Sequence, residues 1–76
     1  MPHVEIWHYP RELSEDAARR LESAIVDAIT QAFEVTDGAV SIGLETVDPA
    51  RWTEDVYRPL ITERAAETTL LRTPGY

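Results

Sequence analysis

The chain contains no cysteine and no lysine, and each absence removes a class of chemistry. Without cysteine there is no disulfide framework and no thiolate ligand for a metal. The two histidines, His3 and His8, therefore have no cysteine partner for a structural zinc site, and we expect neither a metal nor any other cofactor. All seven basic residues are arginine, so a lysine Schiff base is excluded, and any amine that acts in catalysis must be the amino terminus.

The chain also lacks an excess of positive charge and any long apolar run. With 7 basic and 14 acidic residues the formal net charge is −7, which argues against binding to nucleic acid or to an anionic membrane surface. No apolar stretch approaches the roughly 20 residues that a transmembrane helix needs. The opening segment MPHVEIWHYP does not have the pattern of a signal peptide. These features predict a cytoplasmic protein.

The length of 76 residues corresponds to a single domain, 1–76, with a modest core. Domains of this size commonly need a disulfide, a metal or a partner subunit for stability. Because the first two are not expected, we predict a homo-oligomer. A homodimer is the first expectation, and a hexamer is the alternative.

The pattern of apolar residues predicts two strands around one long helix. Alternation predicts a strand over 3–9, with Val4 and Ile6 on one face and Trp7 on the other, and we expect another subunit to bury one of these faces. Ser14 is a good N-cap for an amphipathic helix of about twenty residues, which Asp37-Gly38 is expected to end. A second strand is predicted over 39–47.

The order strand, helix, strand predicts an α/β fold built on a βαβ unit with parallel strands. Two strands and one helix cannot close a core, so we expect two units to pair edge to edge, giving a four-stranded sheet completed by dimerisation. The remaining residues predict a helical C-terminal extension. It begins with a short turn over 50–52 and continues as a weaker helix from Thr53 or Arg58 to about Arg72, with Pro59 at a first helical position.

Pro2 is the residue with the most unusual chemistry. Removal of Met1, which is favoured before a small residue, would turn the Pro2 nitrogen from an amide into a secondary amine, and only the amine can act as a base. An apolar pocket or nearby arginines would lower the pKa of that amine toward neutrality, where a general base is most effective. The simpler interpretation is that Pro2 only opens the first strand, where its missing N–H costs nothing. We favour catalysis, because no other conventional base is well placed.

The order and spacing of six segments resemble the tautomerase superfamily, which includes 4-oxalocrotonate tautomerase, and most closely its bacterial tautomerase PptA branch. These segments cover nearly the whole chain and are PHVEI, YPRELSE, AVSIGLE, DPARW, VYRPLI and TPGY. The resemblance implies a βαβ tautomerase fold and a keto–enol isomerase that needs no cofactor. It also implies that Pro2 is the general base and acid of a 1,3-proton shift.

The resemblance further implies substrate-binding residues. Trp52 matches an aromatic residue that lines the pocket and keeps the proline in apolar surroundings. Arg11 lies close to the position of a substrate-binding arginine, although an ungapped alignment places Glu12 there. Ser41 stands where 4-oxalocrotonate tautomerase has a second arginine, so a dicarboxylate is less expected than a smaller or aromatic enol of a 2-oxo acid, such as phenylenolpyruvate.

Two further residues are candidates for substrate binding. His8 could donate a hydrogen bond to the developing enolate, or it could be structural at the end of a strand. Arg51 could reach the pocket beside Trp52, or it could be a solvated surface residue. Two other functions remain open: a relative that hydrates or dehalogenates haloacrylates, and a non-catalytic oligomeric interaction module.

Overall fold

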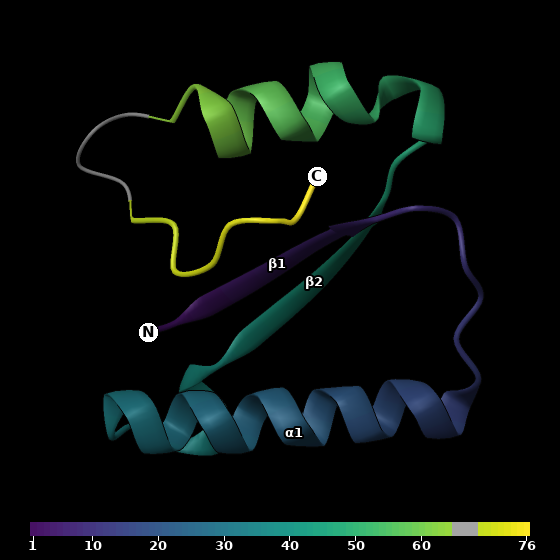
Figure 1. The fold of residues 1–76 in the computed structure, drawn as a ribbon. Helices are drawn as coiled ribbons and strands as arrows, with labels where there is room; N and C mark the ends of the chain where they lie inside the picture. Colours follow the sequence, from purple (N-terminus) through teal and green to yellow (C-terminus); the bar gives the residue numbers. More distant parts are fainter. Residues whose placement is uncertain (65–68) are drawn as a thin grey trace. The chain divides into compact units, whose positions relative to one another are not determined.

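The computed structural model describes residues 1–64 and 69–76, which form two compact units, Met1–Thr46 and Val47–Tyr76. The first unit contains, in order, β1 (His3–His8), α1 (Glu15–Phe33), a 3₁₀ turn (Asp37–Ala39) and β2 (Ser41–Thr46). The second unit contains a 3₁₀ turn (Pro49–Arg51) and a π-helix (Thr53–Thr62). Figure 1 shows these elements along the chain.

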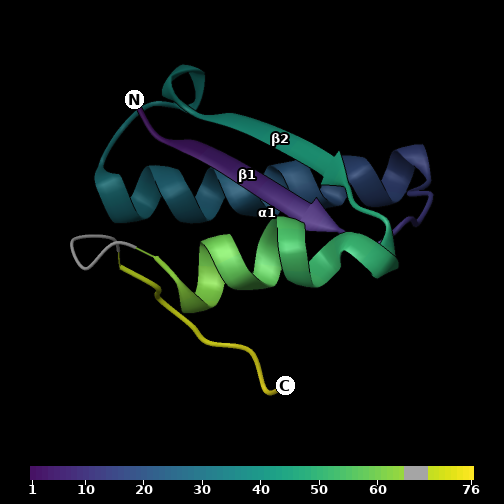
Figure 2. The ribbon, with the colours of Figure 1, turned by 90° about the horizontal axis from the view of Figure 1, so that it is seen from above.

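The first unit confirms the predicted βαβ order and the α/β class. β1 and β2 pair in parallel, with Val4 opposite Ile42 and Ile6 opposite Leu44. α1 connects the two strands and lies along one face of the sheet (Figures 1 and 2). Leu21 of α1 lines the same hollow as Ile42 and Leu44, so the predicted apolar face of the strands is the one that faces the helix.

The start of α1 follows from its local sequence. The Ser14 hydroxyl accepts a hydrogen bond from the Ala17 N–H at 3.0 Å and so satisfies one of the free donors of the first turn. Glu15 and Asp16 occupy that turn, where the helix dipole favours negative charge.

The predicted end of α1 at Asp37-Gly38 is wrong. The helix ends at Phe33, and Glu34 caps it in the left-handed conformation with φ 54° and ψ 50°. In this conformation the backbone N–H of Glu34 still reaches the carbonyl of Thr30, which completes the last turn without a glycine.

The strands are slightly shorter than predicted. β1 ends at His8, and β2 begins at Ser41 because the preceding residues form the 3₁₀ turn. In that turn the N–H of Val40 bonds to the Asp37 carbonyl at 3.2 Å, so it is not available to a neighbouring strand. Ser41 is the first residue whose N–H crosses to the other strand, where it bonds to the Pro2 carbonyl at 3.2 Å.

The helix of the second unit begins at Thr53, the earlier of the two predicted starts, but its predicted end near Arg72 is wrong. It ends at Thr62, and residues 63–64 and 69–72 are not helical, while the part of the prediction over 65–68 lies outside the described residues. Pro59 lies inside the helix rather than at its first position. Since proline has no N–H to donate, this interior position lacks one hydrogen bond to the preceding turn of the helix. Among the described residues, no helix combines the length and apolar composition needed to cross a bilayer.

The described residues have a very small core, in which Val47 and Val56 are the only buried side chains. In the first unit large apolar side chains stay partly in water, such as Leu44 at 49% and Phe33 at 63% exposure. The sheet of the described residues contains only β1 and β2, so each strand has one edge without a partner strand. Such edges and apolar surfaces are suited to pairing with another chain.

Candidate active site

Pro2 lies directly before β1 and is held there by the backbone. Its carbonyl accepts the hydrogen bond from Ser41, and its ring is half-buried. Together with Val4, Ile29 and Phe33 it lines an open hollow of about 410 Å³ between the start of β1 and the end of α1. Met1 is 98% exposed, so the residue that must be removed to free the Pro2 amine is accessible. While Met1 is attached, the Pro2 nitrogen is an amide and has no basicity.

His8 and Arg11 line a second hollow of the first unit, at the other end of β1. Its volume is about 470 Å³, and it is walled mainly by apolar groups: Ile6, Tyr9, Pro10, Leu13, Leu21 and Leu44. No hydrogen bond or ion pair joins the Arg11 guanidinium to another described residue, so the cation is available to a ligand. A hollow with apolar walls and one cation suits a small anion with an apolar body.

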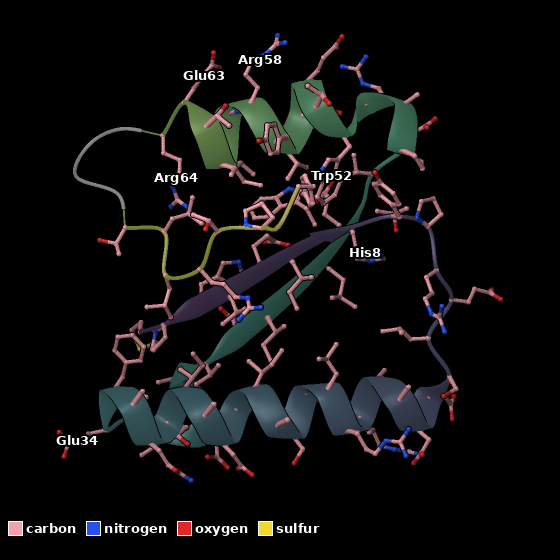
Figure 3. The ribbon with its side chains drawn as sticks, viewed as in Figure 1. His8, Glu34, Trp52, Arg58, Glu63 and Arg64 are labelled. Carbon is pink, nitrogen blue, oxygen red and sulfur yellow. The ribbon has the colours of Figure 1, made fainter. Side chains whose placement is uncertain are left out.

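The hydrogen bonding of His8 defines what its ring can do. Its Nδ1 lies 2.6 Å from the Tyr9 carbonyl oxygen, which can only accept, so Nδ1 carries a proton. In the neutral ring Nε2 is then an acceptor. Donation from Nε2 to an enolate, as predicted from the sequence, therefore requires the protonated imidazolium. Figure 3 shows His8 where β1 ends.

The structure does not bring Pro2 together with His8 and Arg11 within one copy of the unit. Pro2 precedes the first residue of β1, and His8 is its last residue. At about 3.3 Å per residue, their backbones lie roughly 20 Å apart along the strand. One small substrate cannot contact both ends of β1 in a single chain.

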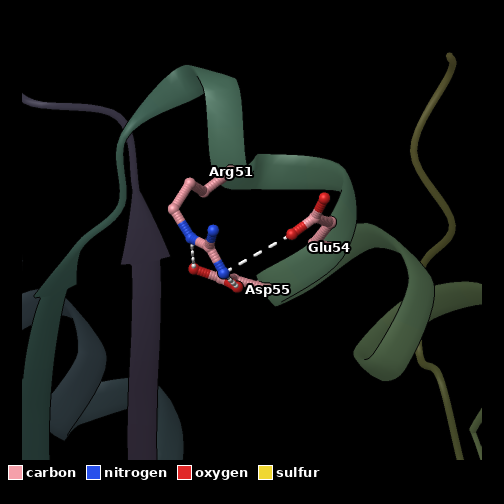
Figure 4. Close-up of polar contacts among 3 residues, drawn as sticks. All are labelled: Arg51, Glu54 and Asp55. Carbon is pink, nitrogen blue, oxygen red and sulfur yellow. Dashed lines mark hydrogen bonds and ion pairs between the residues drawn. The ribbon is translucent and has the colours of Figure 1, made fainter.

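Arg51 is engaged by acidic neighbours in the second unit (Figure 4). Its Nε and Nη2 donate to the two carboxylate oxygens of Asp55 at 3.1 and 3.0 Å, and Glu54 lies at 3.5 Å from Nη2. The hydrogen bonds and charge of Asp55, followed by the charge of Glu54, raise the pKa of the Arg51 guanidinium above its ordinary value. A substrate carboxylate would have to displace these partners, which favours the surface interpretation of Arg51.

Trp52 belongs to a small aromatic cluster of the second unit. Its indole Nε1 donates to the Tyr76 hydroxyl at 3.0 Å, and the ring of Tyr76 lies 5.5 Å from the ring of Tyr57. Trp52 is half-buried and is labelled in Figure 3. The sequence indicated Trp52 but gave no role to Tyr76, because only the folded unit brings these two residues together.

A polar cluster that the sequence did not reveal lies beside Pro2. His3 Nδ1 is 2.7 Å from the Ser41 hydroxyl oxygen, and His3 Nε2 is 2.9 Å from a carboxylate oxygen of Glu5. Alternation places these residues on one face of the sheet, but only the observed register puts His3 opposite Ser41. Nowhere in residues 1–64 and 69–76, this cluster included, are three histidine, aspartate or glutamate side chains grouped so that they could hold a metal ion.

Comparison with known proteins finds full-length relatives, although no family model matches the chain. Tautomerase PptA of Pectobacterium carotovorum subsp. carotovorum is 32% identical over 76 residues, which are 100% of this chain and 97% of the relative. Proteins of the same name from Escherichia coli (strain SMS-3-5) and Klebsiella pneumoniae (strain 342) are each 33% identical over 76 residues, with the same coverage.

Proposed function

Since the chain belongs to the tautomerase PptA family, and is therefore a keto–enol isomerase, we propose that Pro2 is its catalytic base once Met1 has been removed. The proposed substrate is a small 2-oxo acid in its enol form, such as phenylenolpyruvate. The observation that carries the proposal is the position of Pro2: its carbonyl accepts a hydrogen bond from Ser41, its ring lines a largely apolar hollow, and the Met1 before it is exposed.

The surroundings of Pro2 suit a base that works near neutral pH. Val4, Ile29 and Phe33 line its hollow, and apolar groups stabilise the neutral amine over the ammonium ion. In the proposed mechanism these surroundings favour the neutral amine, the form that can take up a proton and later return it.

The proposed reaction moves one proton and needs no cofactor. The lone pair of the neutral Pro2 nitrogen removes the proton of the enol hydroxyl, and the O–H bond breaks to leave an enolate. The Pro2 ammonium then delivers a proton to the β-carbon, which forms the C–H bond of the keto product and restores the neutral amine. The enzyme therefore returns to its starting protonation state after each turnover.

Arg11 and the apolar hollow around it are proposed to hold the substrate. The guanidinium pairs with the carboxylate of the 2-oxo acid, and the walls that include Ile6, Leu21 and Leu44 accept its apolar part. His8 lies in the same hollow, and in its imidazolium form its Nε2 can donate a hydrogen bond to the enolate oxygen that Pro2 leaves behind.

A second copy of the chain is proposed to complete the site. Antiparallel pairing of two β1 strands through their free edges, about a two-fold axis perpendicular to the sheet, gives a four-stranded sheet with both α1 helices on one face. The same pairing places Pro2 of one subunit beside His8 and Arg11 of the partner subunit. We therefore propose a homodimer as the smallest active form, with a hexamer of such dimers as the alternative.

A kinetic assay of the processed protein tests the role of Pro2. Intact mass first establishes that Met1 has been removed, and ultraviolet absorbance then follows the conversion of phenylenolpyruvate to its keto form. Pro2→Ala should lower kcat by about a hundredfold or more, within the range lost with a general base. Pro74→Ala, which changes a proline of the second unit, is the matched control and should stay within about twofold of the wild type.

A form that keeps Met1 gives a second test with an unchanged amino-acid sequence. It should be inactive because its Pro2 nitrogen is an amide, and treatment with methionine aminopeptidase should restore activity. Full activity of Pro2→Ala or of the Met1 form would refute the mechanism. Hydration of haloacrylates without ketonisation would support the hydratase alternative, and inactivity on both substrates would support a non-catalytic module.

A further inference from the structure

We propose that Ser41, His3 and Glu5 form a clasp that positions the Pro2 amine, and that Gly43 provides the space this clasp needs. The inference rests on the proposed role of Pro2 as the base. None of these side chains has to touch the substrate: their effect passes through the backbone at the start of β1. They are therefore positioning residues for the isomerisation rather than catalytic ones.

Ser41 holds the first two residues that remain after processing. Its N–H bonds to the Pro2 carbonyl at 3.2 Å, and its hydroxyl bonds to His3 Nδ1 at 2.7 Å. Removal of Met1 leaves Pro2 as a chain end, and chain ends fray unless they are tied to the rest of the fold. Two bonds from one residue of β2 restrict both the main chain at Pro2 and the side chain that follows it.

Glu5 fixes the orientation of the His3 ring. Its carboxylate oxygen lies 2.9 Å from Nε2, and because a carboxylate only accepts, Nε2 carries a proton. In the neutral ring Nδ1 then accepts from the Ser41 hydroxyl, and in the charged ring Nδ1 donates to the same oxygen. The bond between His3 and Ser41 therefore persists in both protonation states, so the clasp is not a pH switch.

Gly43 is the residue opposite Glu5 in the parallel pair. A Cβ at position 43 would lie 2.8 Å from both Cδ and Oε1 of Glu5 and would also collide with Oε2. The obstructing atoms are the end of a flexible side chain, so the Glu5 carboxylate would swing away while the backbone pairing stays. Gly43→Ala thus moves Glu5 off His3 without changing any residue of the clasp.

Kinetics of clasp variants separate positioning from simple stability. Ser41→Ala removes the hydroxyl but keeps the N–H to Pro2, and it should lower kcat by about tenfold, the scale of a small misplacement of a reacting group. KM should stay within about twofold, and Ser41→Thr, which keeps a hydroxyl, should restore kcat. The helical circular dichroism of each variant establishes that α1 is intact.

A double-mutant cycle tests the link between Glu5 and Gly43. Glu5→Ala and Gly43→Ala should each lower kcat, and the double variant should be no slower than Glu5→Ala alone, because the added methyl group then displaces nothing. Glu45→Ala, which removes a carboxylate farther along β2 opposite Trp7, is the matched control and should not change kcat. Independent, multiplicative effects of the two substitutions would overturn the role of Gly43.

The NMR signals of Pro2 report its conformation without requiring turnover, so they test the clasp separately from the proposed function. The ¹³C signals of labelled Pro2 should be single and dispersed in the wild type, and they should move toward random-coil values in Ser41→Ala and Gly43→Ala. If the wild type is inactive but these signals shift in the two variants, the clasp is supported and only the catalytic role of Pro2 is refuted. Unchanged signals in both variants would overturn the clasp whatever the activity.

Discussion

Replacing Arg11 by alanine is expected to weaken substrate binding far more than replacing Arg51 by alanine. Both arginines were candidates for the substrate carboxylate, and the structure gives them different surroundings. Arg11 has no ion pair among the described residues and lines an apolar hollow, whereas Arg51 is bound by Asp55 and Glu54. Comparing the KM values of Arg11→Ala and Arg51→Ala therefore shows which guanidinium is available to a ligand.

The size of the effect follows from the exposure of Arg11. A hydrogen bond to a charged group contributes about 1.5–3 kcal/mol. Because the Arg11 side chain is exposed, screening by solvent reduces this to about 1–2 kcal/mol. At 1.4 kcal/mol for each factor of ten, KM should rise about five- to thirtyfold in Arg11→Ala. Arg11→Lys keeps the charge but cannot make a bidentate contact with a carboxylate, so its KM should lie between those of the wild type and Arg11→Ala.

The assay measures initial rates of ketonisation over a range of substrate concentrations at two ionic strengths. The KM of the wild type should rise with added salt, and the KM of Arg11→Ala should rise less because its ion pair is already absent. Arg51→Ala should keep the KM of the wild type within about twofold. A KM unchanged in Arg11→Ala but raised tenfold in Arg51→Ala would refute the assignment.

Three further results are expected. When Pro2→Ala and Arg11→Ala chains are mixed and exchange subunits, about one quarter of wild-type activity should appear at low substrate concentration. Half of the dimers are then mixed, and each mixed dimer has one intact site of two. If mass spectrometry verifies the exchange but no activity returns, the shared site is contradicted. Ser14→Ala removes the cap of α1 and should lower the free energy of unfolding by about 1 kcal/mol, which corresponds to a fall in Tm of about 4–8 °C. An equal fall in Tm in Ser23→Ala would show that the cap is not responsible. Tyr76→Phe removes the acceptor of the Trp52 indole and should shift Trp52 fluorescence in a Trp7→Phe background; an unchanged spectrum would argue against this hydrogen bond in solution.

The fold of the first unit was largely predictable because its signals are local. Ser14 and the acidic residues after it define the start of α1, and alternation defines both strands. The end of α1 was not predictable, because Glu34 adopts the left-handed conformation that usually marks glycine. The second helix has a π pattern and ends at Thr62, and the apolar spacing gives no sign of either.

The sequence was sufficient to single out candidate residues of the site but not to predict how they are arranged in space. Pro2 and Arg11 could be singled out by their chemistry, yet only the structure shows that β1 separates them. The contact of Arg51 with Asp55 follows from a four-residue spacing, but it required knowing that a helix begins at that point. The cluster of His3 with Ser41 depends on the register of two strands that are far apart in the sequence.

The close approach of Gly43 to the Glu5 carboxylate has a consequence for how this protein can evolve. A side chain at position 43 and a long acidic side chain at position 5 exclude each other in the observed geometry. A lineage that gains a larger residue at 43 turns the Glu5 carboxylate away from His3, so an acidic residue at position 5 then loses the contact that favours it. Positions 5 and 43, which are distant in sequence, should therefore covary among relatives, because they lie opposite each other in the register of β1 and β2.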